Sequence, residues 1–255
     1  MAAGLSATRR MHKPLLRPSA YSEILAGSEL PLVVGGQAIN IWAEVYANQA
    51  PALADYAPFT SADADIYGTR ALAETLAKRQ GWECHFITER DSVAVAVLVK
   101  AGMEGQPVLT IEVLKEVNGL SDSDLALSSM VELSDGYTYR APSPLVLLKA
   151  KLYNLVSLAN LDRPQDLKHA RMLLQIIPHY FNELWSEVRA SRLTEEILLA
   201  AVNYAGSVIL APFAVNAARS HGLDLRSIFP SSLRVGGPEN IRGVIQGICE
   251  RVAAA

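Results

Sequence analysis

The chain has 255 residues, of which 50% are hydrophobic and 19% charged, and its formal net charge is −3. This composition suffices for a large core and argues against a disordered chain. The small net charge supplies no global basic field for nucleic acid, although a local basic groove is compatible with it. Cys84 and Cys249 lie far apart without metal-ligand spacing, which suits a reducing cytoplasm. No apolar run reaches the roughly 18 residues that a membrane span needs, so we expect no membrane partner.

The N-terminal segment is basic. Residues 1–20 contain no acid and include Arg9, Arg10, Lys13 and Arg17. A transit peptide has a similar composition, but the hydrophobic segment of a secretory signal is missing. We expect residues 1–20 to form a disordered basic tail.

The next 120 residues predict a mixture of helices and strands. Apolar periodicity, glycines and prolines predict helices at 21–29, 37–48 and 70–79, with Gly81 capping the last of these, and a loop at 49–60. Strands are expected at 32–34, 61–67, 83–87, 93–99 and 108–114, followed by a hairpin of 130–133 and 137–140 around a two-residue Asp135-Gly136 turn.

After Pro142 and Pro144 the pattern becomes almost entirely helical. Helices are expected at 145–158, 165–177, 179–190, 194–220 (interrupted near Gly206 or Pro212) and 239–252. We therefore expect an α+β chain in two domains. Residues 21–141 would form a mixed sheet with flanking helices, and residues 142–255 a helical bundle.

Asp63 and Asp65 suggest a metal site. In an extended strand, residues i and i+2 point to the same face, so the two carboxylates would repel each other unless a cation lies between them. Oxygen ligands favour Mg²⁺ or Mn²⁺. A solvated strand end is the alternative. Glu112 lies within the apolar run VLTIEVL and would need a partner if buried, which a shared metal would provide. Exposure on an edge strand is the alternative for Glu112.

Gly35 and Gly36 separate a predicted strand from a predicted helix. Such a turn lets backbone N–H groups approach a phosphate at the helix N-terminus, although many such turns are merely tight connections. Neither GxGxxG nor GxxxxGK[ST] is present.

Basic side chains later in the chain allow two interpretations. Lys149 and Lys151 lie on one predicted helix, and only one of them can face a given groove. A charged cluster follows at Arg163, Asp166, Lys168, His169 and Arg171. Solvated lysines and a structural ion-pair network are the alternatives to a functional role.

In order and spacing these motifs resemble the polymerase-beta-like nucleotidyltransferase superfamily, most closely the bacterial AbiEii-type toxins. The resemblance covers roughly residues 30–175. It rests on four segments: GGQA, TSADADIY, SPLVLLKAKL at 143–152 and RPQDLKHARML at 163–173. The chain departs from that pattern at Gln37, where Ser or Thr is common, at Ala64, and in the long interval between Gly36 and Asp63.

The resemblance implies a cytoplasmic, metal-dependent transfer of NMP from an NTP to an acceptor hydroxyl. Asp63, Asp65 and Glu112 would be catalytic and would bind Mg²⁺ or Mn²⁺. The nucleotide would contact Gly35, Gly36, Gln37, Ser61 and either Lys149 or Lys151. The acceptor is unidentified and could be a small molecule, a protein or RNA such as tRNA, and a toxin would have an antitoxin partner. The alternative is a catalytically weak or inactive module that binds nucleotide or a partner.

Overall fold

The computed structural model describes residues 15–25, 30–90, 92–103, 107–159 and 163–255. The predicted basic tail therefore lies largely outside the described residues. The strands are β1 (Leu32–Val34), β2 (Ala64–Tyr67), β3 (Glu83–Phe86), β4 (Ala94–Ala101), β5 (Pro107–Leu114), β6 (Ser128–Glu132) and β7 (Thr138–Pro142). The helices of the same region are α1 (Ser22–Leu25), α2 (Gly35–Tyr46), α3 (Arg70–Gln80) and α4 (Asp122–Ala126), with 3-10 turns η1 (Pro18–Tyr21) and η2 (Pro51–Tyr56).

The strands form one mixed sheet in the order β3-β4-β5-β2-β1-β7-β6. The pairs β2–β5 and β1–β7 are parallel, and the other neighbours are antiparallel. One face carries fully buried side chains such as Val33, Ile66 and Val113, against which α2 and α3 pack. This arrangement confirms the expected α+β class with a mixed sheet and flanking helices.

The other face of the sheet is covered differently. Leu32 and Val34 of β1 form a small second cluster there with Leu125 of α4. Because side chains alternate along a strand, Asp65 and Tyr67 share this second face, while Ala64 and Ile66 point into the main core.

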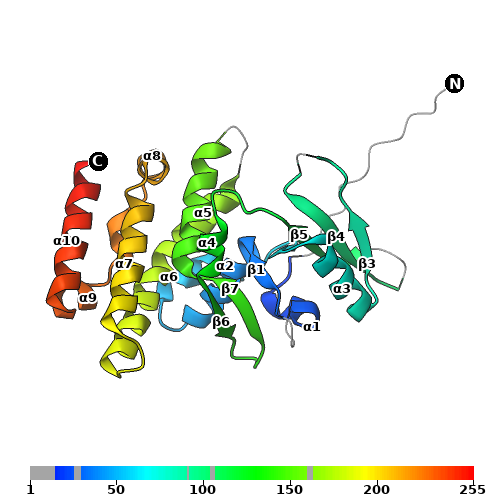
Figure 1. Cartoon of the computed structure of the whole chain (residues 1–255), viewed down its shortest axis with the longest axis horizontal. Coiled ribbons are helices and arrows are strands. Elements are labelled where there is room, and N and C mark those ends of the chain that lie inside the picture. Colours follow the sequence, from blue (N-terminus) through cyan, green and yellow to red (C-terminus); the bar gives the residue numbers. More distant parts are fainter. Residues whose placement is uncertain (1–14, 26–29, 91, 104–106, 160–162) are drawn as a thin grey trace.

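The remaining helices occupy the opposite end of the molecule from β3 and β4 (Figure 1). They are α5 (Pro144–Ser157), α6 (Pro164–Arg189), α7 (Glu195–Ile209), α8 (Pro212–His221), α9 (Ser231–Gly236) and α10 (Glu239–Ala254), with the 3-10 turn η3 (Leu225–Ile228). Most of the buried apolar side chains form one main cluster from Tyr21 to Ile248, so α2 and α6 share the same core as the sheet.

Several predicted boundaries were wrong for identifiable reasons. The expected strand at 61–67 begins only at Ala64, because residues 62 and 63 form a bend after an isolated bridge between Leu16 and Ser61. The helices expected at 165–177 and 179–190 form one continuous α6, with Pro178 inside it. Tertiary packing of its apolar face on the core overrides the local break that proline favours.

Turns and short helices account for the other differences. The hairpin loop has three residues rather than two, since the Leu133 N–H donates to the Tyr137 carbonyl and Gly136 adopts a left-handed φ of 84°. The interruption expected near Pro212 is confirmed by the break between α7 and α8. The short elements η1, η2, α4, η3 and α9 were not predicted.

Within the described residues, no single helix is both long and apolar enough to cross a membrane. Helices α7 and α8 would reach that length and composition only as a pair, and they are bent by 66° relative to each other.

Candidate functional site

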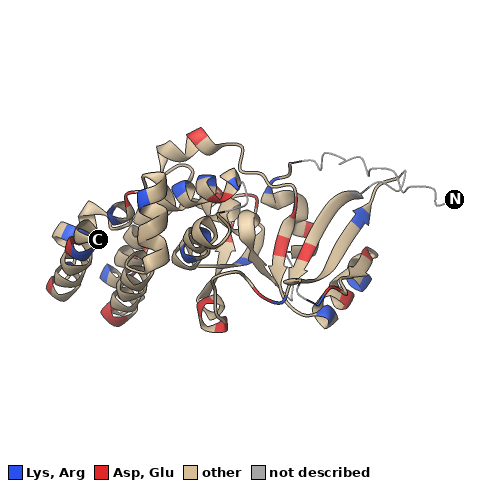
Figure 2. Ribbon diagram, turned by 90° about the horizontal axis from the view of Figure 1, so that it is seen from above, with Lys and Arg blue, Asp and Glu red and all other residues tan. Residues whose placement is uncertain are grey.

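The site is organised around two carboxylates on neighbouring parallel strands. Asp65 of β2 is the register partner of Glu112 of β5, and both are partly exposed. Side chains at paired positions of adjacent strands project from the same face of a sheet, so the two carboxylates lie next to each other. Figure 2 shows acidic positions side by side on strands in the middle of the sheet.

Asp63 is not part of strand β2, unlike Asp65. It lies in the bend before β2 and not in the strand predicted for it, so strand alternation does not place it beside Asp65. Both aspartates nevertheless act on the buried hydroxyl of Tyr21. Burial raises the pKa of Tyr21 to about 12, and the charge of Asp63 adds more to this than that of Asp65. No sequence signal had singled out Tyr21.

Gly35 brings the start of α2 against Asp65. Val34 of β1 pairs with Asp65, and the chain then turns directly into the helix. Gly35 has a φ of +65°, and a Cβ at this position would lie 2.1 Å from Oδ2 of Asp65. Both observations require glycine here, since other residues rarely adopt this backbone conformation. The carboxylate thus lies beside the positive end of the helix dipole, where negative charge is stabilised.

Gly36 contacts a different set of side chains. A Cβ on Gly36 would lie 3.0 Å from Cε1 of His169 and 3.4 Å from Oγ of Ser61. Ser61 is itself held by backbone hydrogen bonds with Leu16. The glycine pair therefore joins the strand carboxylates on one side to α6 on the other.

His169 is buried and uncharged. Its side chain is 2% exposed, and burial, followed by the positive charge of Lys151, lowers its pKa to about 3. Nε2 lies 3.0 Å from the amide nitrogen of Gln165, which can donate to it only if the imidazole proton is on Nδ1. That Nδ1 has no hydrogen-bond partner among the described residues.

A buried ion-pair cluster adjoins His169. Lys151 donates to Oδ1 of Asp166 at 2.7 Å, and Arg163 lies 2.8 Å from Oδ2. Burial alone would raise the pKa of Asp166, but the charge and hydrogen bond of Lys151, aided by Arg163, lower it. Two cations around one carboxylate leave a net positive charge near the glycine turn. The sequence had singled out Arg163 and Asp166 as part of a charged cluster without placing them at the site, whereas the resemblance had offered Lys151 as a nucleotide contact.

Lys149 belongs to a separate network. Its Nζ donates to Oδ2 of Asp124 at 2.8 Å, and the Tyr204 hydroxyl donates to Oδ1 at 2.6 Å. Burial would raise the pKa of Asp124, but the hydrogen bonds from Lys149, Ser121 and Tyr204 lower it to about 2. This network joins α4, α5 and α7. Of the two lysines proposed for the nucleotide, only Lys151 therefore lies beside the residues that contact the glycine turn.

Gln37 has a structural role in the described contacts. Its side chain is fully buried, its amide donates to the Leu16 carbonyl at 3.0 Å, and its Oε1 accepts from Asn40 at 3.2 Å. The amide nitrogen holds the N-terminal segment against α2, and the amide oxygen is occupied by Asn40 of the same helix. The expected contact between Gln37 and a nucleotide therefore finds no support in its surroundings.

Asp65 and Glu112 form an open pair of carboxylates, and not a closed cage of protein ligands. Among the described residues, no group of three or more His, Cys, Asp or Glu side chains is placed to hold a metal ion. Mg²⁺, however, commonly takes only one or two protein carboxylates and completes its shell with water and substrate phosphates. Two neighbouring carboxylates beside an anion-favouring helix start meet that requirement.

Comparison with known proteins adds no assignment. No protein-family model matches the chain, and no curated protein matches it either.

Proposed function

We propose that this chain is a metal-dependent nucleotidyltransferase that acts on an NTP. The observation that carries the proposal is the convergence of three features that are separate in sequence. The carboxylates of Asp65 and Glu112 lie on paired strands, Gly35 packs against Asp65, and Gly36 packs against His169. A carboxylate pair beside a helix N-terminus can hold a cation and the phosphates that the cation accompanies.

Each residue group would have a distinct task. Asp65 and Glu112, with Asp63 nearby, would hold Mg²⁺ or Mn²⁺, which neutralises phosphate charge and lowers the pKa of a coordinated hydroxyl. The N–H groups at the start of α2 would bind the β- and γ-phosphates, and Ser61 Oγ would donate to them. The surplus positive charge of Lys151 and Arg163 around Asp166 would favour the polyanion at this position.

The proposed reaction is phosphoryl transfer to a hydroxyl. The acceptor oxygen forms a bond to the α-phosphorus while the bond between that phosphorus and the α–β bridging oxygen breaks. The products are the NMP ester of the acceptor, pyrophosphate and the proton lost from the hydroxyl. We propose the cytoplasm as the location, since NTPs are held there and both cysteines, Cys84 and Cys249, are free thiols. The proposal covers the transfer reaction, and it names neither the acceptor, such as tRNA, nor an antitoxin partner.

The proposal can be tested on the full chain with Mg²⁺ and each labelled NTP, measuring binding by calorimetry and pyrophosphate release in the same samples. We expect Asp65→Asn and Glu112→Gln to weaken Mg²⁺-dependent binding about tenfold or more, since each removes a charged ligand. Asp55→Asn removes the same charge from an exposed 3-10 turn that supplies no residue to the proposed site, and it should change nothing.

Equal binding by all three variants and the unchanged chain would refute the metal site. Binding without pyrophosphate release, with a range of hydroxyl acceptors present, would instead identify a nucleotide-binding module that does not turn over.

A further inference from the structure

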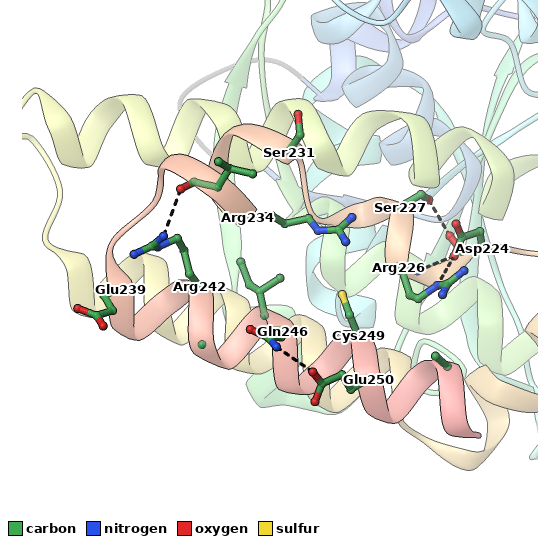
Figure 3. Close-up of a pocket in the computed structure, with 14 residues that line it drawn as sticks. Asp224, Arg226, Ser227, Ser231, Arg234, Glu239, Arg242, Gln246, Cys249 and Glu250 are labelled. Atoms are coloured by element: carbon green, nitrogen blue, oxygen red, sulfur yellow. Dashed lines mark hydrogen bonds and ion pairs between the residues drawn. The ribbon is translucent and has the colours of Figure 1, made fainter.

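A large groove lies at the C-terminal end of the chain, between η3, α9 and α10 (Figure 3). Its volume is about 1030 Å³. This is at the upper end of the range for small-molecule sites, about 300–1,000 Å³. None of the residues of the nucleotide site proposed above lines it.

Three arginines line the groove, each from a different element. Arg226 comes from η3, Arg234 from α9 and Arg242 from α10. Arg226 donates to Oδ1 of Asp224 at 3.1 Å, whereas Arg242 is directed to the Val235 carbonyl at 3.5 Å. Arg234 has no ion pair or side-chain hydrogen bond with any described residue. Figure 3 shows its side chain extended along the groove toward Ser227 and Cys249.

Arg226 and Arg234 both lie near Cys249, which lines the same groove. Both act to lower the pKa of its thiol, against the larger effect of burial, which raises that pKa. Asp224 is the only carboxylate among the groups that influence this thiol. Glu250 accepts instead from Gln246 at 2.9 Å, and Glu239 lies at the far end of α10 (Figure 3). Two cations facing one carboxylate leave this part of the groove positive.

The kinds of residue present identify the chemistry of a ligand. The groove is lined by three arginines, three acids and no lysine, so its lining is neutral as a whole, and the positive part lies at Arg226 and Arg234, where Asp224 is the neighbouring acid. Arginine is the side chain that matches the oxygens of a phosphate with two parallel hydrogen bonds. No aromatic side chain is among the residues that line the groove, so it offers no aromatic ring on which a base could stack. Recognition would therefore run chiefly through phosphate groups.

We propose that Arg226 and Arg234 form a second phosphate-binding site, which takes an oligophosphate anion, either free or as part of a nucleic-acid backbone. This site does not depend on the nucleotidyl transfer proposed above. It is separate from the glycine turn in both sequence and position.

Cys249 lines the groove near both arginines, so its reactivity can report occupancy of the site. The full chain carrying Cys84→Ser has a single thiol, whose alkylation by N-ethylmaleimide can be timed with pyrophosphate or a short mixed-sequence RNA present. EDTA in the buffer suppresses Mg²⁺-dependent binding elsewhere. We expect each probe that binds to slow alkylation. The half-protecting concentration should rise about tenfold or more in Arg226→Gln plus Arg234→Gln, since charged hydrogen bonds are lost.

Arg251→Gln is the matched control. It removes the same charge from α10 at a position that does not line the groove, where Arg251 donates only to the Gly247 carbonyl. Protection in this variant should be unchanged. Arg234→Lys keeps the charge but loses the bidentate hydrogen bonding of the guanidinium group. If the double variant does not fold, this single variant tests the site.

The two probes distinguish the source of the phosphate. Protection at lower phosphate concentration by pyrophosphate indicates a free oligophosphate, and stronger protection by RNA indicates a nucleic-acid backbone. Unchanged alkylation with both probes, up to about 10 mM pyrophosphate, would overturn the proposal, because such an affinity is negligible. Equal loss of protection in Arg251→Gln and the arginine double variant would overturn it as well. A failed transfer assay affects neither result.

Discussion

Gly35→Ala tests the contact that joins the glycine turn to the carboxylates. The left-handed backbone at Gly35 costs an L-residue about 1–2 kcal/mol. In addition, the new Cβ would lie 2.1 Å from Oδ2 of Asp65, whereas ordinary van der Waals contacts begin at 3.4 Å. The carboxylate must leave its rotamer, which costs about 0.5–1.5 kcal/mol more. We expect a total destabilisation of about 1.5–3.5 kcal/mol.

Gly81→Ala is the matched control for the backbone term. Gly81 has a φ of +66° but nothing within 4 Å of its Cβ position, so its replacement by alanine should cost only about 1–2 kcal/mol. The effect of alanine on the unfolded chain is the same in both variants and cancels in the comparison. The excess loss in Gly35→Ala, about 1 kcal/mol, therefore measures the contact with Asp65.

A double-mutant cycle with Asp65→Ala isolates that contact. Truncation leaves the Cβ of Asp65 3.2 Å from the new Cβ at position 35, so most of the clash disappears. The cost of Gly35→Ala in this background should fall to that of Gly81→Ala. Urea unfolding, followed by far-ultraviolet circular dichroism, measures all of these variants. If Gly35→Ala costs no more than Gly81→Ala, or if the cycle shows no coupling, Gly35 does not lie against Asp65.

Two further predictions concern the buried charges. Lys151→Met should lower the free energy of unfolding by about 3 kcal/mol or more, because buried Asp166 loses its closest cation. Adding Asp166→Asn should restore part of the lost stability. Lys149→Met should cost less than Lys151→Met, because Ser121 and Tyr204 still donate to Asp124. Equal losses in urea unfolding for the two lysine variants would contradict the assignment. The second prediction concerns acid. The pKa of His169 is lowered from 6.5 to about 3, so the unfolded chain binds its proton first. Stability should therefore fall by about 1.4 kcal/mol per pH unit below pH 6.5. The pKa of Asp124, lowered from 3.8 to about 2, adds a loss that begins below about pH 5 and continues to about pH 2. His169→Gln should flatten the upper phase only, and an unchanged slope between about pH 6 and 5 in that variant would refute the buried neutral histidine.

The long and strongly patterned elements were predictable from local sequence. Periodicity gave β1 its observed limits and placed α3, α5 and α10 to within two residues. The left-handed cap at Gly81 also followed from residue type alone, because few other residues adopt that conformation. Short elements such as α4 and α9 gave no such signal, since a helix of one or two turns has too few residues for periodicity.

The candidate site likewise combines residues that could be selected from sequence with contacts that could not. Sequence alone selected the glycine pair, the aspartates, Glu112, the two lysines and the charged segment at 163–171, since these residue types carry phosphate and metal chemistry. It could not choose between Lys149 and Lys151, because helical spacing says that they diverge but not which neighbour each meets. Only the packing of α5 against α6 directs Lys151 to Asp166 and leaves Lys149 with Asp124.

Sequence determined which side chains could do chemistry, and tertiary structure decided which of them meet. The pairing of Asp65 with Glu112 depends on the register of two strands separated by 39 residues of chain, which local pattern does not encode. The contact of Gly36 with His169 depends on α6 packing against α2, which the shared apolar core fixes. The burial of Gln37 depends on the return of residue 16 to Ser61. In each case the deciding interaction is between residues distant in sequence, so it exists only once the core has formed.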